Sequence, residues 1–262
     1  MKKVGFFTLL FCFTLGFSGA LLAHDMWTTA DAPAAGQPLK LNVGYGHNFP
    51  AFEAIPDEEL PYFQVKLLGQ SGELPITASS SPNYQWTSKD PAQAGAYLFI
   101  SDVKPIFWSQ TPDGWVMKPK NEAKGATSCG YTIENAKGII NVGAPATSDL
   151  IGKPAGLPLE IVPKVNPSAV KPGDKVPLTV YLDGKPAPGV KVEGRFAGYD
   201  QLVGSPEARA FVSVSDSKGE LTFVPLAAGD WILTARSEKP YEDLTKCDKT
   251  DYGTSLFFNI PK

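Results

Sequence analysis

The sequence predicts an all-β protein built from two β-sandwich domains of the immunoglobulin-like or transthyretin-like kind. Its 262 residues include 24 prolines and 25 glycines, about a fifth of the chain against ~12% in an average protein, and both residues disfavour long helices. Short alternating or β-branched runs are broken by Gly, Pro, Asn and Asp every ~8–12 positions, as in antiparallel sandwiches. Hydrophobic residues make up 43% and charged residues 19%, which is enough to bury a core.

The N-terminus has the pattern of a secretory signal peptide. A basic start, Met1–Lys3, precedes the apolar run Val4–Leu22, which ends in small residues. We expect a signal peptide over residues 1–23, cleaved after Ala23, so that His24 begins a periplasmic or secreted chain. Cleavage after Ala20 and an uncleaved membrane anchor are the alternatives. No later segment reaches the ~20 apolar residues of a membrane span, so no membrane insertion is expected after cleavage.

In the first half, residues 24–155, the strands are expected one after another with short turns between them. The alternation in Leu39–Val43 favours a half-buried strand, and the apolar run Ala96–Ile100 favours a strand buried on both faces. A further strand is predicted over Tyr62–Leu67, and Phe107–Val116 is expected to be a hairpin around Pro-Asp-Gly. Short helical turns are expected near residues 57–60 and 121–125.

A boundary is predicted at the Gly- and Pro-rich segment Gly152–Gly156, so the second domain covers residues 156–262. This half has the size and the roughly seven strands of an immunoglobulin-like or transthyretin-like module. The strands are expected at Leu157–Pro163, Val176–Leu182, Val190–Phe196, Glu220–Phe223, Gly229–Arg236 and Thr254–Ile260. Trp231 alternates inward in its strand and is expected in the core.

Cys129 and Cys247 remain after Cys12 leaves with the signal peptide. Export to an oxidising compartment favours a disulfide between them, and a pair of metal-binding thiolates is the alternative. Because a Cys129–Cys247 bridge would close a long loop across the domain boundary, it is expected to contribute about 4–5 kcal/mol and to clamp the two domains together.

The chain has only two histidines, His24 and His47, and both are candidate metal ligands. A mature N-terminal His24 offers its α-amino nitrogen and its imidazole, which can chelate one ion, and His47 follows the predicted strand Leu39–Val43 in a Gly-flanked loop. An all-nitrogen set suits Cu(II) or Ni(II), while neutral imidazole also suits Co(II) or Zn(II). Further oxygen or sulfur ligands could come from nearby residues, namely Asp25, Met26, Glu53, Asp57, Glu58 and Glu59.

Several function classes are disfavoured by the sequence. The net charge is −3 and no Lys/Arg cluster is interleaved with aromatics, so no nucleic-acid partner is expected. No Gly-x-Ser-x-Gly, dinucleotide fingerprint or phosphate loop is present, and no catalytic residue or organic cofactor is predicted. We therefore expect a binding protein and not an enzyme.

Three blocks of sequence together resemble a known family. They are Ala23–Trp27, Gly46–Pro50 with its His47 and Phe49, and Gly156–Pro163 followed by Asp183–Pro186. These blocks resemble exported bacterial proteins of unknown function that are assigned to nickel/cobalt uptake as its periplasmic components (NikM-like). The resemblance covers nearly the whole mature chain. It implies an exported β-rich protein with a metal-related role and places His24 and His47 in the family's His-bearing blocks, but it identifies no third ligand.

The leading hypothesis is a periplasmic protein that binds a transition metal ion (Ni, Co or Cu) through His24 and His47 and hands it to a membrane uptake component. The alternative is a glycan- or protein-binding envelope module that uses the Trp108/Trp115 hairpin. A copper oxidoreductase is a third hypothesis, because a terminal-His nitrogen set with an open position can activate oxygen species. The metal, the uptake partner and the oligomeric state are not determined by the sequence.

Overall fold

The computed structural model describes residues 24–31, 33–80, 84–145, 147–205 and 208–262. The predicted signal peptide, residues 1–23, lies outside the described residues and stays a prediction. Strands dominate the described parts of the chain, where the two α-helices are short: α1 (Asp149–Gly152) and α2 (Tyr199–Val203). Of the helices in these ranges, none is both long and apolar enough to cross a membrane. The all-β class is therefore as predicted.

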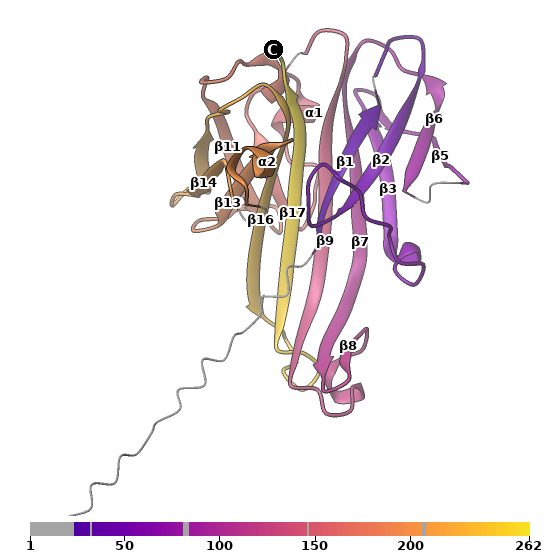
Figure 1. The fold of residues 1–262 in the computed structure, drawn as a ribbon, viewed down its shortest axis with the longest axis vertical. Coiled ribbons are helices and arrows are strands. Elements are labelled where there is room, and N and C mark those ends of the chain that lie inside the picture. The colour runs from indigo at the N-terminus through magenta and orange to yellow at the C-terminus, as the bar shows by residue number, and fades with distance from the viewer. Residues whose placement is uncertain (1–23, 32, 81–83, 146, 206–207) are drawn as a thin grey trace, which may run out of the picture.

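The described residues form three sheets (Figure 1). The N-terminal sheet has the order β1 (Asp25–Asp31), β2 (Pro38–Gly46), β6 (Gln85–Pro91), β5 (Ile76–Ala78). In the C-terminal sheet β11 (Val176–Leu182) pairs with β10 (Leu159–Pro163), β12 (Lys185–Pro186) and β15 (Glu220–Phe223). The nine-stranded central sheet has the order β14 (Phe211–Val214), β13 (Lys191–Phe196), β16 (Gly229–Pro240), β17 (Lys249–Ile260), β9 (Ser128–Val142), β7 (Gly95–Thr111), β3 (Phe63–Gly69), β4 (Gly72–Leu74), with β8 (Gly114–Val116) on β7.

The two smaller sheets cover opposite faces of the central sheet, as the alternation along β7 shows. Leu98 and Ile100 point into the core shared with the C-terminal sheet, while Tyr97 and Phe99 point into the core shared with the N-terminal sheet. Because successive side chains of a strand point to opposite faces, a strand covered on both sides is a continuous apolar run. All of Ala96–Ile100 is buried, as the sequence predicts.

The central sheet contains strands from both sides of the predicted boundary at residues 155 and 156. It is continuous because β17 pairs with β9 in parallel, from Lys249↔Gly130 to Phe257↔Gly138. The β7, β9, β16 and β17 strands run side by side along the long axis of the molecule (Figure 1). The two sandwiches therefore share one sheet, a feature that the strand pattern does not reveal.

Two further predictions about the core and the cross-link are confirmed. Trp231 is fully buried in the core under the C-terminal sheet. Cys129 and Cys247 form a disulfide with a Cα–Cα distance of 4.9 Å. The bridge joins the start of β9 to the segment that precedes β17, and so ties together the two strands whose parallel pairing unites the sandwiches.

A buried ion pair connects β9 to the first strand after the boundary. The Lys137 and Glu160 side chains are 2% and 1% exposed and form a hydrogen-bonded ion pair. Glu160 also accepts hydrogen bonds from the backbone N–H groups of residues 155–157. These bonds satisfy the carboxylate and hold the boundary segment against the central sheet, so both members of the pair are needed.

Replacing Lys137 by Met is expected to lower the free energy of unfolding by about 3 kcal/mol, because it leaves a buried carboxylate without its counter-ion. Lys249→Met is the matched control, since Lys249 pairs with Glu238 on the surface, and a loss below about 1 kcal/mol is expected. Urea denaturation with the disulfide intact measures both. Equal midpoints for the two variants would contradict a structural role for the buried pair.

Candidate metal centre

His24 and His47 lie next to each other because of the register between β1 and β2. The two strands pair antiparallel with Asp25 opposite Gly46, so one step further along the same register places His24 opposite His47. The imidazole centroids are 4.1 Å apart at an interplanar angle of 51°. His24 also stacks on Tyr45, with centroids 4.3 Å apart at 15°. Residues 23 positions apart in sequence are thus held together by local strand pairing.

Glu53 completes a three-residue cluster with the two histidines. Its Oε1 lies 3.0 Å from His47 Nδ1, and its Oε2 lies 3.3 Å from His24 Nε2. The backbone N–H of His47 also donates to Oε1 at 2.7 Å. These hydrogen bonds hold the pKa of the Glu53 carboxyl below its usual value, the backbone bond from His47 being the largest cause.

The loop over residues 47–53 carries Glu53 back to the strand end. The N–H of Glu53 donates to the Tyr45 carbonyl at 2.7 Å, which closes the loop onto β2. Gly46 has φ of +148°, and a Cβ at this position would come within 2.8 Å of Glu53 Oε1. The backbone conformation therefore favours a glycine here, and a Cβ would also displace the Glu53 side chain from its present position.

The cluster has the donor types and spacing of a transition-metal site. One ligand atom from each of His24, His47 and Glu53 lies within 4.8 Å of the others. Metal–nitrogen bonds of ~2.0–2.1 Å and metal–oxygen bonds of ~2.0–2.2 Å place neighbouring ligand atoms about 3 Å apart, so the observed contacts need little adjustment. The three side chains are 36%, 37% and 42% exposed, and an ion can reach them from solvent.

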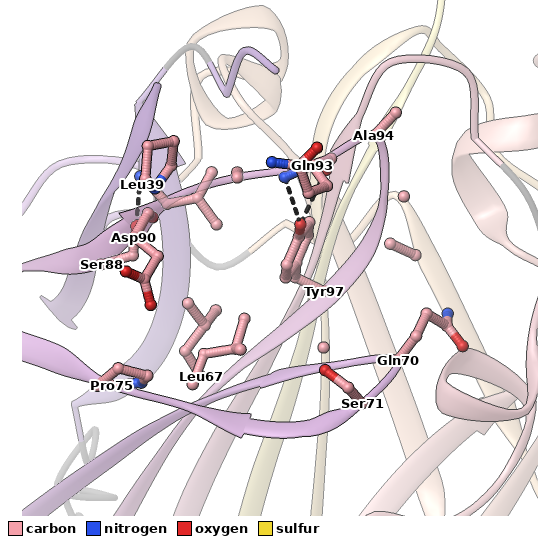
Figure 2. A pocket seen from close by; sticks show the side chains of 16 residues that line it. Leu39, Leu67, Gln70, Ser71, Pro75, Ser88, Asp90, Gln93, Ala94 and Tyr97 are labelled. Carbon is pink, nitrogen blue, oxygen red and sulfur yellow. Dashed lines mark hydrogen bonds between the residues drawn. The ribbon is translucent and has the colours of Figure 1, made fainter. Parts of the chain in front are cut away.

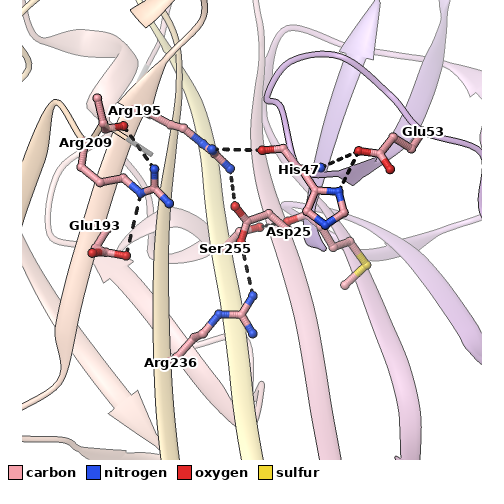
Figure 3. Close-up of polar contacts among 10 residues, drawn as sticks. Asp25, His47, Glu53, Glu193, Arg195, Arg209, Arg236 and Ser255 are labelled. Carbon is pink, nitrogen blue, oxygen red and sulfur yellow. Dashed lines mark hydrogen bonds and ion pairs between the residues drawn. The ribbon is translucent and has the colours of Figure 1, made fainter. Parts of the chain in front are cut away.

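An arginine from the other half of the chain contacts both ligand-bearing segments (Figure 3). Arg195, on β13, forms an ion pair with Asp25 and donates to the His47 carbonyl at 3.3 Å. Arg236, on β16, contacts the second oxygen of Asp25 at 3.4 Å. Because Arg195 is only 8% exposed, its guanidinium is largely shielded from water and links the backbone of His47 to Asp25, the neighbour of His24.

The other residues named as further ligands have different roles. Met26 is buried in the core of the N-terminal sandwich, and Asp25 is engaged by the two arginines. Glu59 accepts a hydrogen bond from the Tyr45 hydroxyl at 3.0 Å, while Asp57 and Glu58 are exposed. The structure therefore brings one of the six, Glu53, into the cluster.

Glu134, Arg195 and Tyr45 were not singled out by sequence reasoning. Glu134 lies on β9 beside Gly253, and burial raises its pKa to about 7 against the lowering effect of Arg236. Burial and the neighbouring Glu59 likewise raise the pKa of Tyr45 well above its ordinary value, so its hydroxyl stays protonated. No local motif marks these residues. Alternation along a strand predicts which face of the sheet a side chain lies on, but it does not predict which residues of other strands will contact that side chain.

The hairpin tryptophans lie elsewhere in the molecule. Phe107–Val116 forms the predicted hairpin, with Thr111 paired to Gly114 across the turn. Figure 1 places β8 at the lower tip, away from the start of β1. Trp115 is 41% exposed, whereas Trp108 is half-buried.

Together the fold and the cluster define an all-β sandwich protein with a partly exposed His–His–Glu site at a strand end. The chain belongs to the family described as "Domain of unknown function (DUF4198)", whose model matches residues 21–239. No curated protein matches the chain.

The chain shares only low similarity with solved structures, for example those of two other proteins. The BSP domain of a biofilm-associated protein is 12% identical, with 90% of this chain and 29% of that chain covered and a TM-score of 0.23. The Escherichia coli adhesin FdeC is 14% identical, with 91% and 64% covered and a TM-score of 0.23. The chain thus spans less than two thirds of either protein, and at these TM-scores the likeness carries no argument about function.

The raised pKa of Glu134 predicts how stability depends on pH. A carboxyl whose pKa is higher in the folded than in the unfolded state binds a proton on folding, so its contribution is complete below about pH 4.5 and is lost as pH rises through about 7. Glu134→Gln should therefore be more stable than the wild type at pH 8, by about 3 kcal/mol, and similar to it at pH 4.5.

Urea denaturation of both proteins at a series of pH values measures this difference. Glu58→Gln, an exposed substitution, serves as the control and should leave the curve unchanged. A constant difference between Glu134→Gln and the wild type from pH 4.5 to 8 would contradict the proposed titration.

Proposed function

We propose that the protein is an exported, periplasmic metal-binding protein that captures Ni(II), Co(II) or Cu(II) through His24, His47 and Glu53 and passes the ion to an uptake component in the membrane. The observation that carries the proposal is the convergence of the chain's two histidines and one carboxylate on a partly exposed strand end. The resemblance to nickel/cobalt uptake proteins agrees with this role. Binding, and not catalysis, is proposed.

The mature N-terminus is part of the proposed site. Cleavage after Ala23 leaves the α-amino group of His24 free, beside an imidazole that is already within the cluster. An amino nitrogen with an ordinary pKa of ~7.7–8.0 loses its proton to a metal near neutral pH with little penalty. The set would then contain three nitrogens and one carboxylate oxygen, which favours tetragonal Cu(II) or Ni(II).

Metal titration of the mature protein tests the proposal. Calorimetry is expected to give one ion per chain, with affinity rising from Co(II) to Ni(II) to Cu(II). His24→Ala, His47→Ala and Glu53→Gln should each weaken binding, the histidine variants by at least ~100-fold. Glu58→Gln, an exposed acid of the neighbouring loop, is the matched control and should bind as the wild type does.

Two outcomes of that titration would count against the site. Affinity and stoichiometry unchanged in both histidine variants would end the proposal. A protein that begins at Ala23 is a second comparison, because its α-amino group is displaced from His24; equal Cu(II) affinity in the two forms would remove the amine from the ligand set.

Arg195 is expected to act as a positioning residue for this centre. Arg195→Met removes the contacts to Asp25 and to the His47 carbonyl and should weaken Cu(II) binding by about tenfold, with a changed Cu(II) electron paramagnetic resonance spectrum. Arg209→Met is the control, since Arg209 pairs with Glu193 and lies on the other side of Arg195 from His47 and Glu53 in Figure 3. A wild-type spectrum and affinity in Arg195→Met would contradict this role.

The second candidate function is recognition of a glycan or an envelope protein by the β8 hairpin, which the exposure of Trp115 favours. A glycan-array screen separates the two candidates. Binding that is lost in Trp115→Ala but retained in His24→Ala and His47→Ala supports the second. The absence of binding, or its loss in the histidine variants, rejects it.

A further inference from the structure

A cleft of about 610 Å³ lies on the side of the β1 edge that is bordered by the ends of β9 and β17. Four aromatic side chains contribute to its wall: Trp27, Phe49, Phe52 and Phe257. Trp27 contacts Phe49 edge-on with centroids 5.4 Å apart, and it lies nearly parallel to Phe52 at 5.9 Å. The volume and the apolar walls are those of a small-molecule site.

Two buried polar atoms of this cleft have no hydrogen-bond partner. Across the described residues three buried side-chain polar atoms are unsatisfied, and two of them, Trp27 Nε1 and Ser168 Oγ, belong to side chains that line the cleft. Trp27 is fully buried and Ser168 is 5% exposed. An indole N–H only donates and a hydroxyl can donate or accept. Both atoms lie just beneath the cleft wall, the Trp27 indole against Gly44, so an oxygen acceptor on a bound molecule satisfies either atom only if the wall shifts to admit it.

A cavity at the other side of the N-terminal sandwich provides a contrast (Figure 2). It has a volume of about 390 Å³ and is lined partly by Leu39 and Leu67. Its main polar groups are satisfied within the protein: the Tyr97 hydroxyl donates to the Gln93 carbonyl at 2.8 Å, and Ser88 Oγ accepts from the Leu39 N–H at 2.9 Å. Of these two cavities, the first is the one whose described lining includes buried side-chain polar atoms without a partner.

The charge of the residues that line the cleft indicates which kind of ligand it can bind. Asp31 and Asp230 line it, while Lys, Arg and His are absent from the described residues of the lining. Asp230 Oδ1 accepts from Asn259 Nδ2 at 2.7 Å, a neutral partner that leaves the negative charge uncompensated. Aromatic faces also attract cations, so an anion is disfavoured and an ammonium group is favoured.

We propose that this cleft binds a small aromatic amine that also carries an oxygen hydrogen-bond acceptor. The ring packs among Phe49, Phe52 and Phe257, the ammonium group lies toward Asp230, and the oxygen accepts from Trp27 Nε1 or Ser168 Oγ. Phe52, which is 41% exposed, forms the rim, where it lies between Trp27 and Tyr84. This site is separate from the proposed metal centre, although the loop over residues 47–53 contributes to both.

Three matched probes test the proposal on the metal-free mature protein in the presence of EDTA, so the outcome is independent of metal binding. They are tyramine, the anion 3-(4-hydroxyphenyl)propionate and the neutral 4-ethylphenol. Tyramine is expected to bind saturably and at least about tenfold more tightly than the anion, with 4-ethylphenol between them. Calorimetry gives the affinities.

Nuclear magnetic resonance of the indole N–H groups locates the bound probe. Tyramine should shift the Trp27 indole resonance, which Trp27→Phe assigns, and leave that of Trp231 in place, because Trp231 Nε1 already donates to the Ala227 carbonyl at 2.9 Å. Phe52→Ala, a substitution at the exposed rim, should weaken tyramine binding by about tenfold. Asp230→Asn should reduce the preference for tyramine over 4-ethylphenol, while Asp31 remains in the lining.

Several results would overturn the inference. These are no saturable tyramine binding up to ~10 mM, equal affinity for the anion, or wild-type affinity in Phe52→Ala. A shift of Trp231 without one of Trp27 would also place the probe elsewhere. Thermal unfolding of Phe52→Ala and Asp230→Asn identifies any variant that fails to fold, and the probe series on the wild type decides the proposal without them.

Discussion

The structure depends on a central sheet whose middle strands are covered on both faces. Along β7 and β9 alternate side chains enter two different cores, one under the N-terminal sheet and one under the C-terminal sheet. Neither small sheet could bury its apolar face without the strands of the other half beside it, because β9 and β17 form one parallel-paired surface. Burial of apolar area, the dominant favourable term in folding, therefore couples the two halves.

The same coupling extends to the candidate metal centre. The ligands belong to the N-terminal half, but the buried guanidinium that holds Asp25 and the His47 carbonyl comes from β13. Close contact between β1 and the central sheet makes this possible: a Cβ on Gly138 would lie 2.1 Å from the Thr28 carbonyl oxygen, so β1 can approach β9 only over a glycine. Ser255 on β17 also donates to the Met26 carbonyl. Strands of both halves thus contact the segments that carry the metal ligands.

One short loop divides its side chains between two environments. His47 and Glu53 face the polar cluster, whereas Phe49 and Phe52 contribute to the aromatic cleft. The backbone bond from Glu53 to the Tyr45 carbonyl and the glycine at position 46 fix where the loop returns to β2. The polar and the aromatic residues of the loop therefore belong to two different sites.

The local sequence pattern predicted much of the fold and part of the candidate metal centre. Alternation and turn residues predicted most of the strands of the second half and the buried Ala96–Ile100, and cysteine pairing was predicted from the export signal. The long β9 was not predicted, because a strand that is covered on both faces along part of its length and carries the polar Lys137 and Asn135 lacks a clean alternation. The bounds of strand β1 were not predicted either, although its register is what brings the histidines together.

The sequence by itself determined the all-β class, the likeness of the second half to a sandwich module, the disulfide partners and the two histidines as candidate ligands, since each of these follows from residue type and local spacing. Only the tertiary structure decided that Glu53 joins them, that Arg195 supports them and that the sandwiches share a sheet. Those facts depend on which strand lies beside which, and strand pairing across long loops is set by the burial of the whole core and not by any local segment.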